Sequence, residues 1–295
     1  MLATGLMAVT TACGSATDTG PADDGEDSGE VERIVVLDLG SLDTLRSLGV
    51  ADKVVGLPRG GVIPEQLAEF DTDAYANVGS LQEPDVEAIA ELDPDLVIAG
   101  FRSQASVEEL SRHFTTIDVT YDQTLPFLDG VEDAALTIGE AVGLEAEAQA
   151  RVDELRAQIE DARADVPQGK TGLALISTGG RLNAQGADGR FSLIFNDIGI
   201  APAAAGLEAA AHGDPMSFEA IQDADADYFF VLDRDAAIGQ EGGEVASQVL
   251  DNALIHETTA WKEDQIVYLD GGRWYLLMHG LDNVEHMIAE VADSL

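Results

Sequence analysis

The sequence predicts an α/β protein with two lobes, each built around a parallel-rich sheet, joined by one long α-helix. Short runs rich in β-branched residues alternate with helical stretches from residue 31 onward, which is typical of βαβ units. A middle segment, 145–165, has apolar residues at spacings of three and four and contains neither Gly nor Pro. In addition, the pattern of residues 85–102 recurs 132 positions later.

The strand-like runs fall into two groups on either side of the middle segment. The first group is 33–39, 53–57 and 95–99, with helices predicted at 41–48 and 86–92. The second group is "TGLALIS", "DYFFVLD" and "QIVYLD", at 171–177, 227–233 and 265–270. Because strands and helices alternate in both groups, we expect one Rossmann-like lobe from each.

The middle segment predicts an amphipathic helix about 30 Å long at 1.5 Å per residue. Gly143 precedes it and Pro167 follows it, so both ends are marked. Such a helix can link two lobes, although a crossover helix within one sheet remains the alternative. The positions expected to be buried are Ala148, Val152, Leu155, Ile159, Ala162 and Val166.

The recurring pattern places equivalent residues in the two lobes. Asp85 aligns with Ser217, and both are good helix N-caps. Arg102 aligns with Arg234, and each follows directly on a strand. Since ligands of open α/β sheets bind at the carboxyl ends of the strands, both arginines are expected at a ligand site between the lobes.

Composition excludes several partners. The 295 residues include 56 acidic and 15 basic ones, giving a net charge of −41 and a pI near 4.1. Such a charge repels nucleic acid and anionic lipid surfaces, and it suggests a high-salt environment. Apolar residues make up 45% of the chain, which is enough for a substantial core.

The N-terminus resembles the end of a lipoprotein signal peptide, because a short apolar run leads into small residues and the single cysteine, Cys13. We expect Cys13 to be lipidated; an ordinary signal peptide or an incidental cysteine are the alternatives. No later run is long and apolar enough for a transmembrane helix. The expected organisation is a signal remnant (1–13), a disordered acidic tether (14–30), an N-terminal lobe (31–144), a bridging helix (145–166) and a C-terminal lobe (167–295).

Three arginines are the candidate ligand-binding residues. Arg190, in the Gly-rich stretch "GADGRFSLIF", joins Arg102 and Arg234. Guanidinium groups stay charged and offer a planar fork of donors, so three of them suit an anionic ligand. The alternative is that each arginine pairs with one of the many carboxylates.

His212 and Tyr275 are candidate ligands of ferric iron, which imidazole and phenolate both bind. A hydrogen-bonded role in a loop is the alternative for each. Trp274 adjoins Tyr275 and is a candidate ligand contact. The sequence lacks the His and Cys spacings of a protein-built metal site, so no permanent cofactor is expected.

Glu87 and Glu219 occupy equivalent places in the first turns of the two predicted helices. Acidic residues there stabilise a helix N-terminus, and a pair on two lobes also suits a basic docking partner. Motifs for nucleophilic catalysis and phosphate binding are missing, so we expect no enzyme. A Rossmann-like nucleotide-dependent enzyme is the rival outside the binding proteins.

Several stretches resemble the iron–siderophore substrate-binding lipoproteins of ABC importers, particularly those that bind petrobactin- and enterobactin-type catecholates. The resemblance runs from about residue 31 to 292. It is carried by "IVVLDLGSLDTLRSLGV", "YANVGSLQEPDVEAIAELDPDLVIAGFRS", "HGDPMSFEAI", "YFFVLDRDAAIG" and "GGRWYL".

The resemblance implies a monomeric class III binding protein, anchored by lipid to the outer face of the cell membrane, that passes a ferric siderophore to an ABC permease. In such relatives, residues matching His212 and Tyr275 fill the iron coordination sites that a bis-catecholate leaves open. Residues matching Glu87 and Glu219 contact the permease. Ferric citrate, haem or a corrinoid are alternative ligands of the class. Where relatives often have a Gly-Gly pair, this chain has Met278-His279-Gly280.

Overall fold

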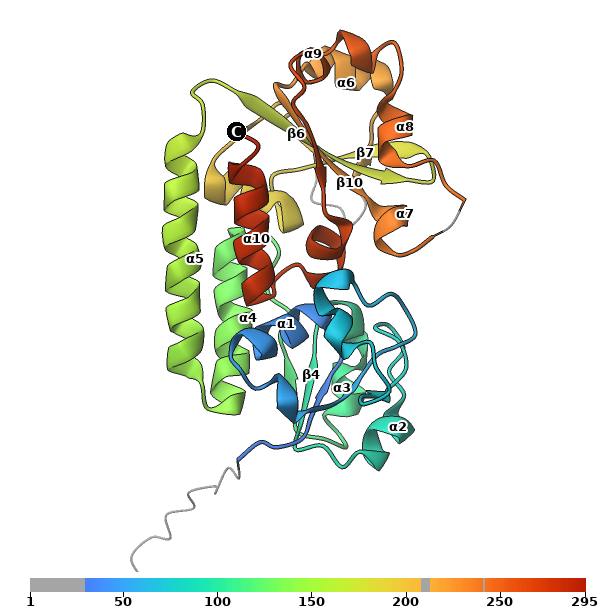
Figure 1. The fold of residues 1–295 in the computed structure, drawn as a ribbon, viewed down its shortest axis with the longest axis vertical. Helices are drawn as coiled ribbons and strands as arrows, with labels where there is room; N and C mark the ends of the chain where they lie inside the picture. The colour runs from blue at the N-terminus through green and yellow to red at the C-terminus, as the bar shows by residue number, and fades with distance from the viewer. Residues whose placement is uncertain (1–29, 208–212, 241) are drawn as a thin grey trace, which may run out of the picture. The chain divides into compact units, whose positions relative to one another are not determined.

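Two separate β-sheets form the centres of two lobes (Figure 1). The computed structural model describes residues 30–207, 213–240 and 242–295. The N-terminal sheet has the order β3-β2-β1-β4-β5 and all its pairings are parallel. Its strands are β1 (Ile34–Val36), β2 (Val54–Leu57), β3 (Ala76–Asn77), β4 (Leu96–Ala99) and β5 (Thr116–Asp118).

Apolar sequence and local capping explain the elements of the N-terminal lobe. β1 and β4 are buried throughout, as continuous apolar runs in a parallel sheet should be. Asp38 and Asp85 each accept backbone N–H bonds at the start of a helix, which confirms Asp85 as an N-cap. The helices are α1 (Leu39–Ser47), α2 (Val86–Glu91), α3 (Val107–Leu110) and α4 (Phe127–Val142), with short helical turns η1 (Ala51–Lys53), η2 (Glu65–Phe70) and η3 (Phe101–Ser106).

The C-terminal sheet is mixed, with the order β11-β10-β6-β7-β9 and with β8 beside β6. β6 pairs in parallel with β10, but β7 turns back antiparallel on β6. Gly179 and Gly180, both with positive φ, form that turn, which favours glycine. The strands are β6 (Thr171–Thr178), β7 (Arg181–Gln185), β8 (Ala201–Pro202), β9 (Asp214–Pro215), β10 (Tyr228–Asp233) and β11 (Ile266–Leu269).

Beyond β6 the chain forms short helices and one longer helix, α10. Ser217 accepts a bond from the backbone N–H of Ala220, so it is the predicted N-cap of α6. The helices are α6 (Phe218–Ala224), α7 (Arg234–Ala237), α8 (Ala246–Leu250), α9 (Thr259–Lys262) and α10 (Leu281–Ala292). The helical turns are η4 (Gly189–Phe191), η5 (Leu193–Ile198), η6 (Ile255–Glu257) and η7 (Gly272–Leu277).

The long helix α5 (Glu145–Asp165) runs along both lobes (Figure 1). Of its predicted apolar positions, Val166 lies just past the helix end and is partly buried; the other five are buried within it. The last helix, α10, follows the C-terminal sheet but packs against both α5 and α1. None of the described helices combines the length and apolarity needed to cross a membrane.

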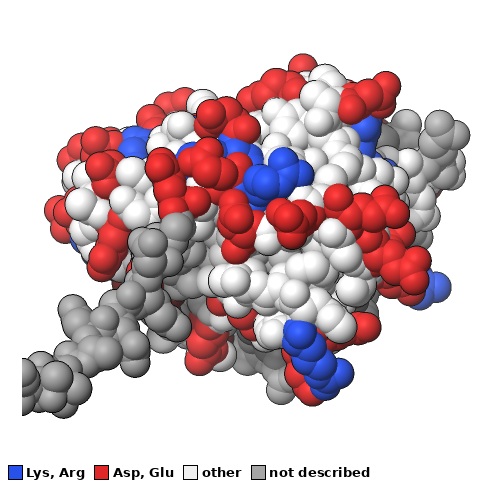
Figure 2. All heavy atoms as spheres, turned by 90° about the horizontal axis from the view of Figure 1, so that it is seen from below, with Lys and Arg blue, Asp and Glu red and all other residues white. Residues whose placement is uncertain are grey.

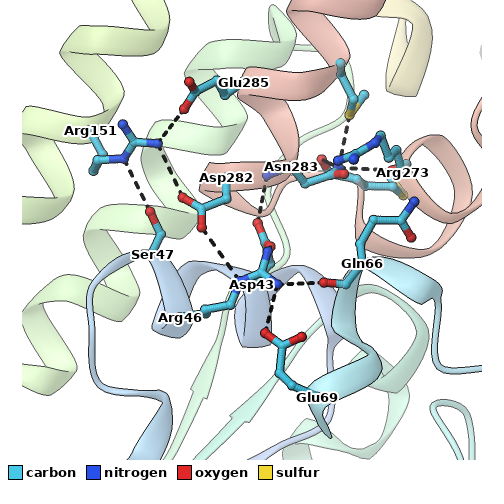
Figure 3. Close-up of polar contacts among 12 residues, drawn as sticks. Asp43, Arg46, Ser47, Gln66, Glu69, Arg151, Arg273, Asp282, Asn283 and Glu285 are labelled. Carbon is cyan, nitrogen blue, oxygen red and sulfur yellow. Dashed lines mark hydrogen bonds and ion pairs between the residues drawn. The ribbon is translucent and has the colours of Figure 1, made fainter. Parts of the chain in front are cut away.

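A polar network joins α1, α5 and α10 (Figure 3). The side chain of Asp43 is fully buried; it forms an ion pair with Arg46 and accepts the backbone N–H of Asn283 at 2.8 Å. Arg151 on α5 reaches Glu285 on α10 at 2.9 Å. The chain returning from the C-terminal lobe is therefore fixed to the N-terminal lobe by charged and polar contacts as well as by packing.

Acidic side chains dominate the face that lies at the bottom of Figure 1, with few lysines and arginines among them (Figure 2). Most of these carboxylates are solvated, which avoids the cost of burying a charge. The surface therefore repels anions, and a site for an anion needs its own local positive charge.

Candidate functional site

Three arginines from both lobes converge on the ring of Tyr275. The guanidinium carbons of Arg102, Arg190 and Arg234 lie 4.9, 4.7 and 5.9 Å from its centroid. Arg102 follows β4 and Arg234 follows β10, as the recurring pattern predicts. We refer to these three residues as the arginine cluster.

The turn after β4 positions Arg102. Phe101 has a φ of +50°, which is unusual for a side chain of its size. Two hydroxyls hold this turn: Thr120 accepts the N–H of Phe101 at 2.7 Å, and Ser103 accepts the N–H of Gly100 at 2.9 Å. Arg102 then donates from Nη2 to the backbone oxygen of Tyr275 at 2.8 Å, across the boundary between the lobes.

The other two arginines are held from the C-terminal lobe. Arg190 donates from Nη1 to the backbone oxygen of Trp274 at 3.4 Å. Arg234 donates from Nε to the hydroxyl oxygen of Tyr275 at 3.2 Å and from Nη1 to Asp235 at 3.3 Å. Asp235 is itself buried and accepts the N–H of Gly179 at 2.6 Å, so it orients Arg234.

Carboxylates do not neutralise the whole cluster. Within the described part of the chain, Arg102 and Arg190 form no ion pair, and only Arg234 has a carboxylate partner. Other arginines, such as Arg59 and Arg156, do pair with carboxylates. Pairing of Arg102 or Arg190 with an acid, the alternative interpretation of these arginines, is thus not found among the described residues.

The cluster changes the acid–base behaviour of its own members. Burial, together with the positive charge of Arg102, lowers the pKa of Arg190 to about 10, against an opposing effect of Tyr275. Burial alone would raise the pKa of Tyr275, but the bond from Arg234 and the charges of all three arginines outweigh it, so its pKa lies below the ordinary 10.0. The surroundings thus favour a phenolate, a hard oxygen ligand suited to ferric iron.

Tyr275 lies on a wide, π-type helical turn, η7, of a kind often found at functional sites. The turn ends at Met278, whose φ is +42°. Asn283 braces both ends, because its side-chain amide donates to the oxygens of Arg273 at 3.1 Å and Met278 at 3.0 Å. This brace connects the site to the polar network of Figure 3.

The Trp274 side chain lies in the core of this structure, and its predicted contact with a ligand stays a prediction. Trp274 is 0% exposed, stacks on Phe191 at 6.0 Å between centroids and donates from Nε1 to Glu290 at 2.6 Å. An indole between a strand and a helix can pack in the core as well as line a ligand site. Here it packs in the core, and its N–H donates to a partly buried carboxylate. Its backbone oxygen, however, supports Arg190.

Sequence reasoning missed several residues behind the cluster. His279 is buried, lies 2.7 Å from Asp38 through Nε2 and stacks on Phe101 at 4.8 Å. Asp235 and Asn283 were also missed. The only available signal was adjacency, since Asp235 directly follows Arg234.

A cavity of about 320 Å³ is lined by residues of both lobes, and neither Tyr275 nor any arginine of the cluster is among them. Asp233, which precedes Arg234, and Gly272, which begins η7, contribute to its wall from the C-terminal lobe. Val62 and Gln66 contribute from the N-terminal lobe. The two lobes therefore leave open space between them near the strand end that precedes Arg234.

The remaining predicted residues lie elsewhere or cannot be placed. Glu87 and Glu219 are exposed in the first turns of α2 and α6, which lie near the lower and upper ends of Figure 1. His212 and Cys13 lie outside the described residues. Among the described residues, no three His, Cys, Asp or Glu side chains are grouped so as to hold a metal ion.

The fold and the site define a two-lobed α/β binding protein of class III, with a single long helix between the lobes and positive groups where they meet. A family model described as periplasmic binding protein matches residues 34–271. The chain belongs to this family, whose members are substrate-binding proteins.

Relatives with known ligands share most of the chain. The petrobactin-binding protein YclQ of Bacillus subtilis is 39% identical over 90% of this chain and 82% of its own. Its crystal structure matches with a TM-score of 0.84, covering 90% of this chain and 92% of that one. The catecholate-siderophore binding protein VctP of Vibrio cholerae is 30% identical with a TM-score of 0.83, covering 89% and 94%.

Proposed function

We propose that this protein captures a ferric siderophore of the catecholate class at the arginine cluster and delivers it to the permease of an ABC importer. Relatives that bind petrobactin, a catecholate siderophore and ferric anguibactin support the ligand class. An iron-uptake ABC transporter substrate-binding protein, PiuA of Streptococcus pneumoniae, supports the transport role, with 33% identity and a TM-score of 0.81.

The observation that carries the proposal is the unneutralised charge of Arg102 and Arg190 in a chain with a large excess of acids. Burying a guanidinium group without a carboxylate partner costs free energy of desolvation unless another anion binds to it. A ferric tris-catecholate carries about three negative charges, and charge-assisted hydrogen bonds from three arginines match them.

Iron coordination by the protein is part of the proposal. Tyr275 would supply a phenolate oxygen, favoured by the positive charges around it. His212 would supply a nitrogen when the siderophore leaves two coordination positions open. Both roles concern the iron of the ligand, and no permanent cofactor is proposed.

Delivery and anchoring complete the proposal. Glu87 and Glu219, exposed on different lobes, would each meet a basic residue of the permease. Lipidation of Cys13 would hold the protein on the outer face of the cell membrane. The protein would act as a monomer, since each lobe supplies one docking glutamate.

Titration with ferric complexes tests the ligand class. Trp274 adjoins Tyr275, so a bound iron complex should quench the intrinsic fluorescence. We expect ferric catecholates to quench at micromolar or lower concentrations, and ferric citrate, ferric hydroxamate and haem to require more. Absence of quenching by every ferric catecholate, with tight binding of another complex, would reassign the ligand.

Visible absorption tests the coordination. A ferric bis-catecholate should change its charge-transfer band on binding the wild-type protein, because protein ligands replace water on the iron. The double variant His212→Ala, Tyr275→Phe should lose that change. If the variant showed the same change of spectrum on binding as wild type, direct coordination by the two residues would be excluded, while the ligand class would still stand.

A further inference from the structure

We infer that Tyr121 is a ligand-contacting residue of the same site, and that its hydroxyl donates a hydrogen bond to an oxygen of the bound siderophore complex. This inference rests on the proposed function. It adds a neutral donor from the N-terminal lobe to the three charged donors.

The ring of Tyr121 is held in one place by its neighbours. It packs edge-on against Phe101 at 5.1 Å and against His279 at 6.2 Å between centroids. It also lies directly on Gly130 of α4, where a Cβ atom would come within 2.3 Å of the ring. The absence of a side chain at Gly130 therefore leaves room for the aromatic ring.

The ring lies beside the arginine cluster. Phe101, which it contacts, is the residue before Arg102. The segment after Tyr121 is bonded to the segment before Arg190, because Gly189 donates its N–H to the oxygen of Gln123 at 2.9 Å. Tyr121 therefore lies where the two lobes meet, between the turns that carry two of the three arginines.

The hydroxyl of Tyr121 is available to a ligand. Within the described residues it has no hydrogen-bond partner, although phenol groups in such half-buried places usually find one. Burial raises the pKa of Tyr121 well above its ordinary value, and the nearby Asp38 raises it further, against the opposing charge of Arg190. The phenol thus stays protonated and can donate, whereas Tyr275, with its lowered pKa, favours the opposite role.

The two tyrosines therefore differ in chemistry at one site. Tyr275 lies among positive charges and is suited to give an oxygen ligand to iron. Tyr121 feels the charges of both Asp38 and Arg190, stays protonated, and is suited to donate a hydrogen bond to a catecholate oxygen that carries negative charge.

The test compares Tyr121→Phe with wild type for binding of a ferric bis-catecholate, followed by Trp fluorescence. Loss of one hydrogen bond to a charged oxygen predicts a Kd about 10-fold or more higher. Tyr75→Phe is the matched control, because Tyr75 is another half-buried tyrosine of the same lobe that packs on Phe70. Its Kd should equal that of wild type.

Two further readouts separate contact from structural support. The hydroxyl makes no hydrogen bond to any described residue, so the melting temperature of Tyr121→Phe should not fall. The ratio of the two Kd values should stay constant from about pH 6 to about pH 9, since the phenol remains neutral there. Tight wild-type binding with an equal Kd for Tyr121→Phe overturns the inference alone. Failure of wild type to bind any ferric catecholate overturns the proposed function and this inference with it.

Discussion

Replacing Arg102 by Ala should weaken binding of a ferric catecholate while leaving the protein folded. Arg102 uses one N–H to hold the oxygen of Tyr275 at 2.8 Å, and the rest of its donor fork has no partner among the described residues. The free protein loses one partly exposed hydrogen bond in the variant. It also loses the repulsion between Arg102 and the half-buried Arg190, which offsets part of that cost.

The expected size of the effect follows from charge and distance. At an effective dielectric constant of about 20, two unit charges about 5 Å apart interact by about 3 kcal/mol. A hydrogen bond to a charged group contributes about 1.5–3 kcal/mol. Because Arg102 is partly exposed and shares its donors with Tyr275, we take about 2 kcal/mol, which corresponds to a Kd about 30-fold higher.

Fluorescence titration measures the change, and a second arginine supplies the control. Arg156 on α5 pairs with Glu132 at 2.6 Å on an exposed face, so Arg156→Ala makes the same change in net charge at a remote place. We expect its Kd to equal that of wild type. If Arg102→Ala changed the Kd less than about 2-fold, the charge of Arg102 would not act on the ligand and the arginine cluster would lose its assigned role.

Three further outcomes follow from other parts of the structure. Asn283→Ala should lower the free energy of unfolding by about 1–3 kcal/mol in a denaturant titration, because the Met278 oxygen loses its Asn283 donor and the Arg273 oxygen keeps only the N–H of Met278; a loss below about 0.5 kcal/mol would contradict the brace. Gly130→Ala should destabilise by about 1–3 kcal/mol and weaken binding, because its Cβ displaces the ring of Tyr121; wild-type affinity in this variant would contradict the packing. In low salt the melting temperature should be higher at about pH 5 than at about pH 8. The sign follows because burial raises the pKa of some carboxyl groups in the folded state above the ordinary 3.8 or 4.5. As the pH falls, the folded state therefore binds protons before the unfolded state does, which stabilises it. A lower melting temperature at about pH 5 than at about pH 8 would contradict this reasoning. The carboxyl groups with raised pKa are Asp43, Asp197 and Glu290.

The elements of the fold could be predicted where sequence periodicity and local capping agree. The apolar runs of β4 and β10 and the spacing along α5 are local patterns, and each is enough to define its element. Asp85 and Ser217 cap their helices through atoms only two or three residues away. The β6–β7 hairpin was not predicted, because alternating strands and helices indicate parallel units, although the Gly179-Gly180 pair is typical of a tight turn.

The candidate site could be predicted only in part, because its contacts join residues far apart in the chain. The repeat predicted that Arg102 and Arg234 lie at one site, because equivalent residues of two similar lobes occupy equivalent places in the fold. Nothing local indicates that Trp274 turns into the core toward Glu290, or that His279 turns inward to Asp38. Both side-chain positions depend on how α10 packs against the other lobe. His279, for example, contacts a residue more than 200 positions away in the sequence.

The arginine cluster resolves the conflict between a protein of net charge −41 and an anionic ligand. Repulsion by the acidic surface acts over long distances, and salt screens it, with a Debye length of about 8 Å at physiological ionic strength and about 3 Å at 1 M. The guanidinium groups act instead at hydrogen-bond distance in a partly buried place, where screening is weak. Because backbone oxygens and a phenol, not carboxylates, hold Arg102 and Arg190, their charge stays available at that distance. High salt therefore removes the barrier to approach more than it weakens the bound state, and a strongly acidic receptor for an anion is physically consistent in concentrated salt.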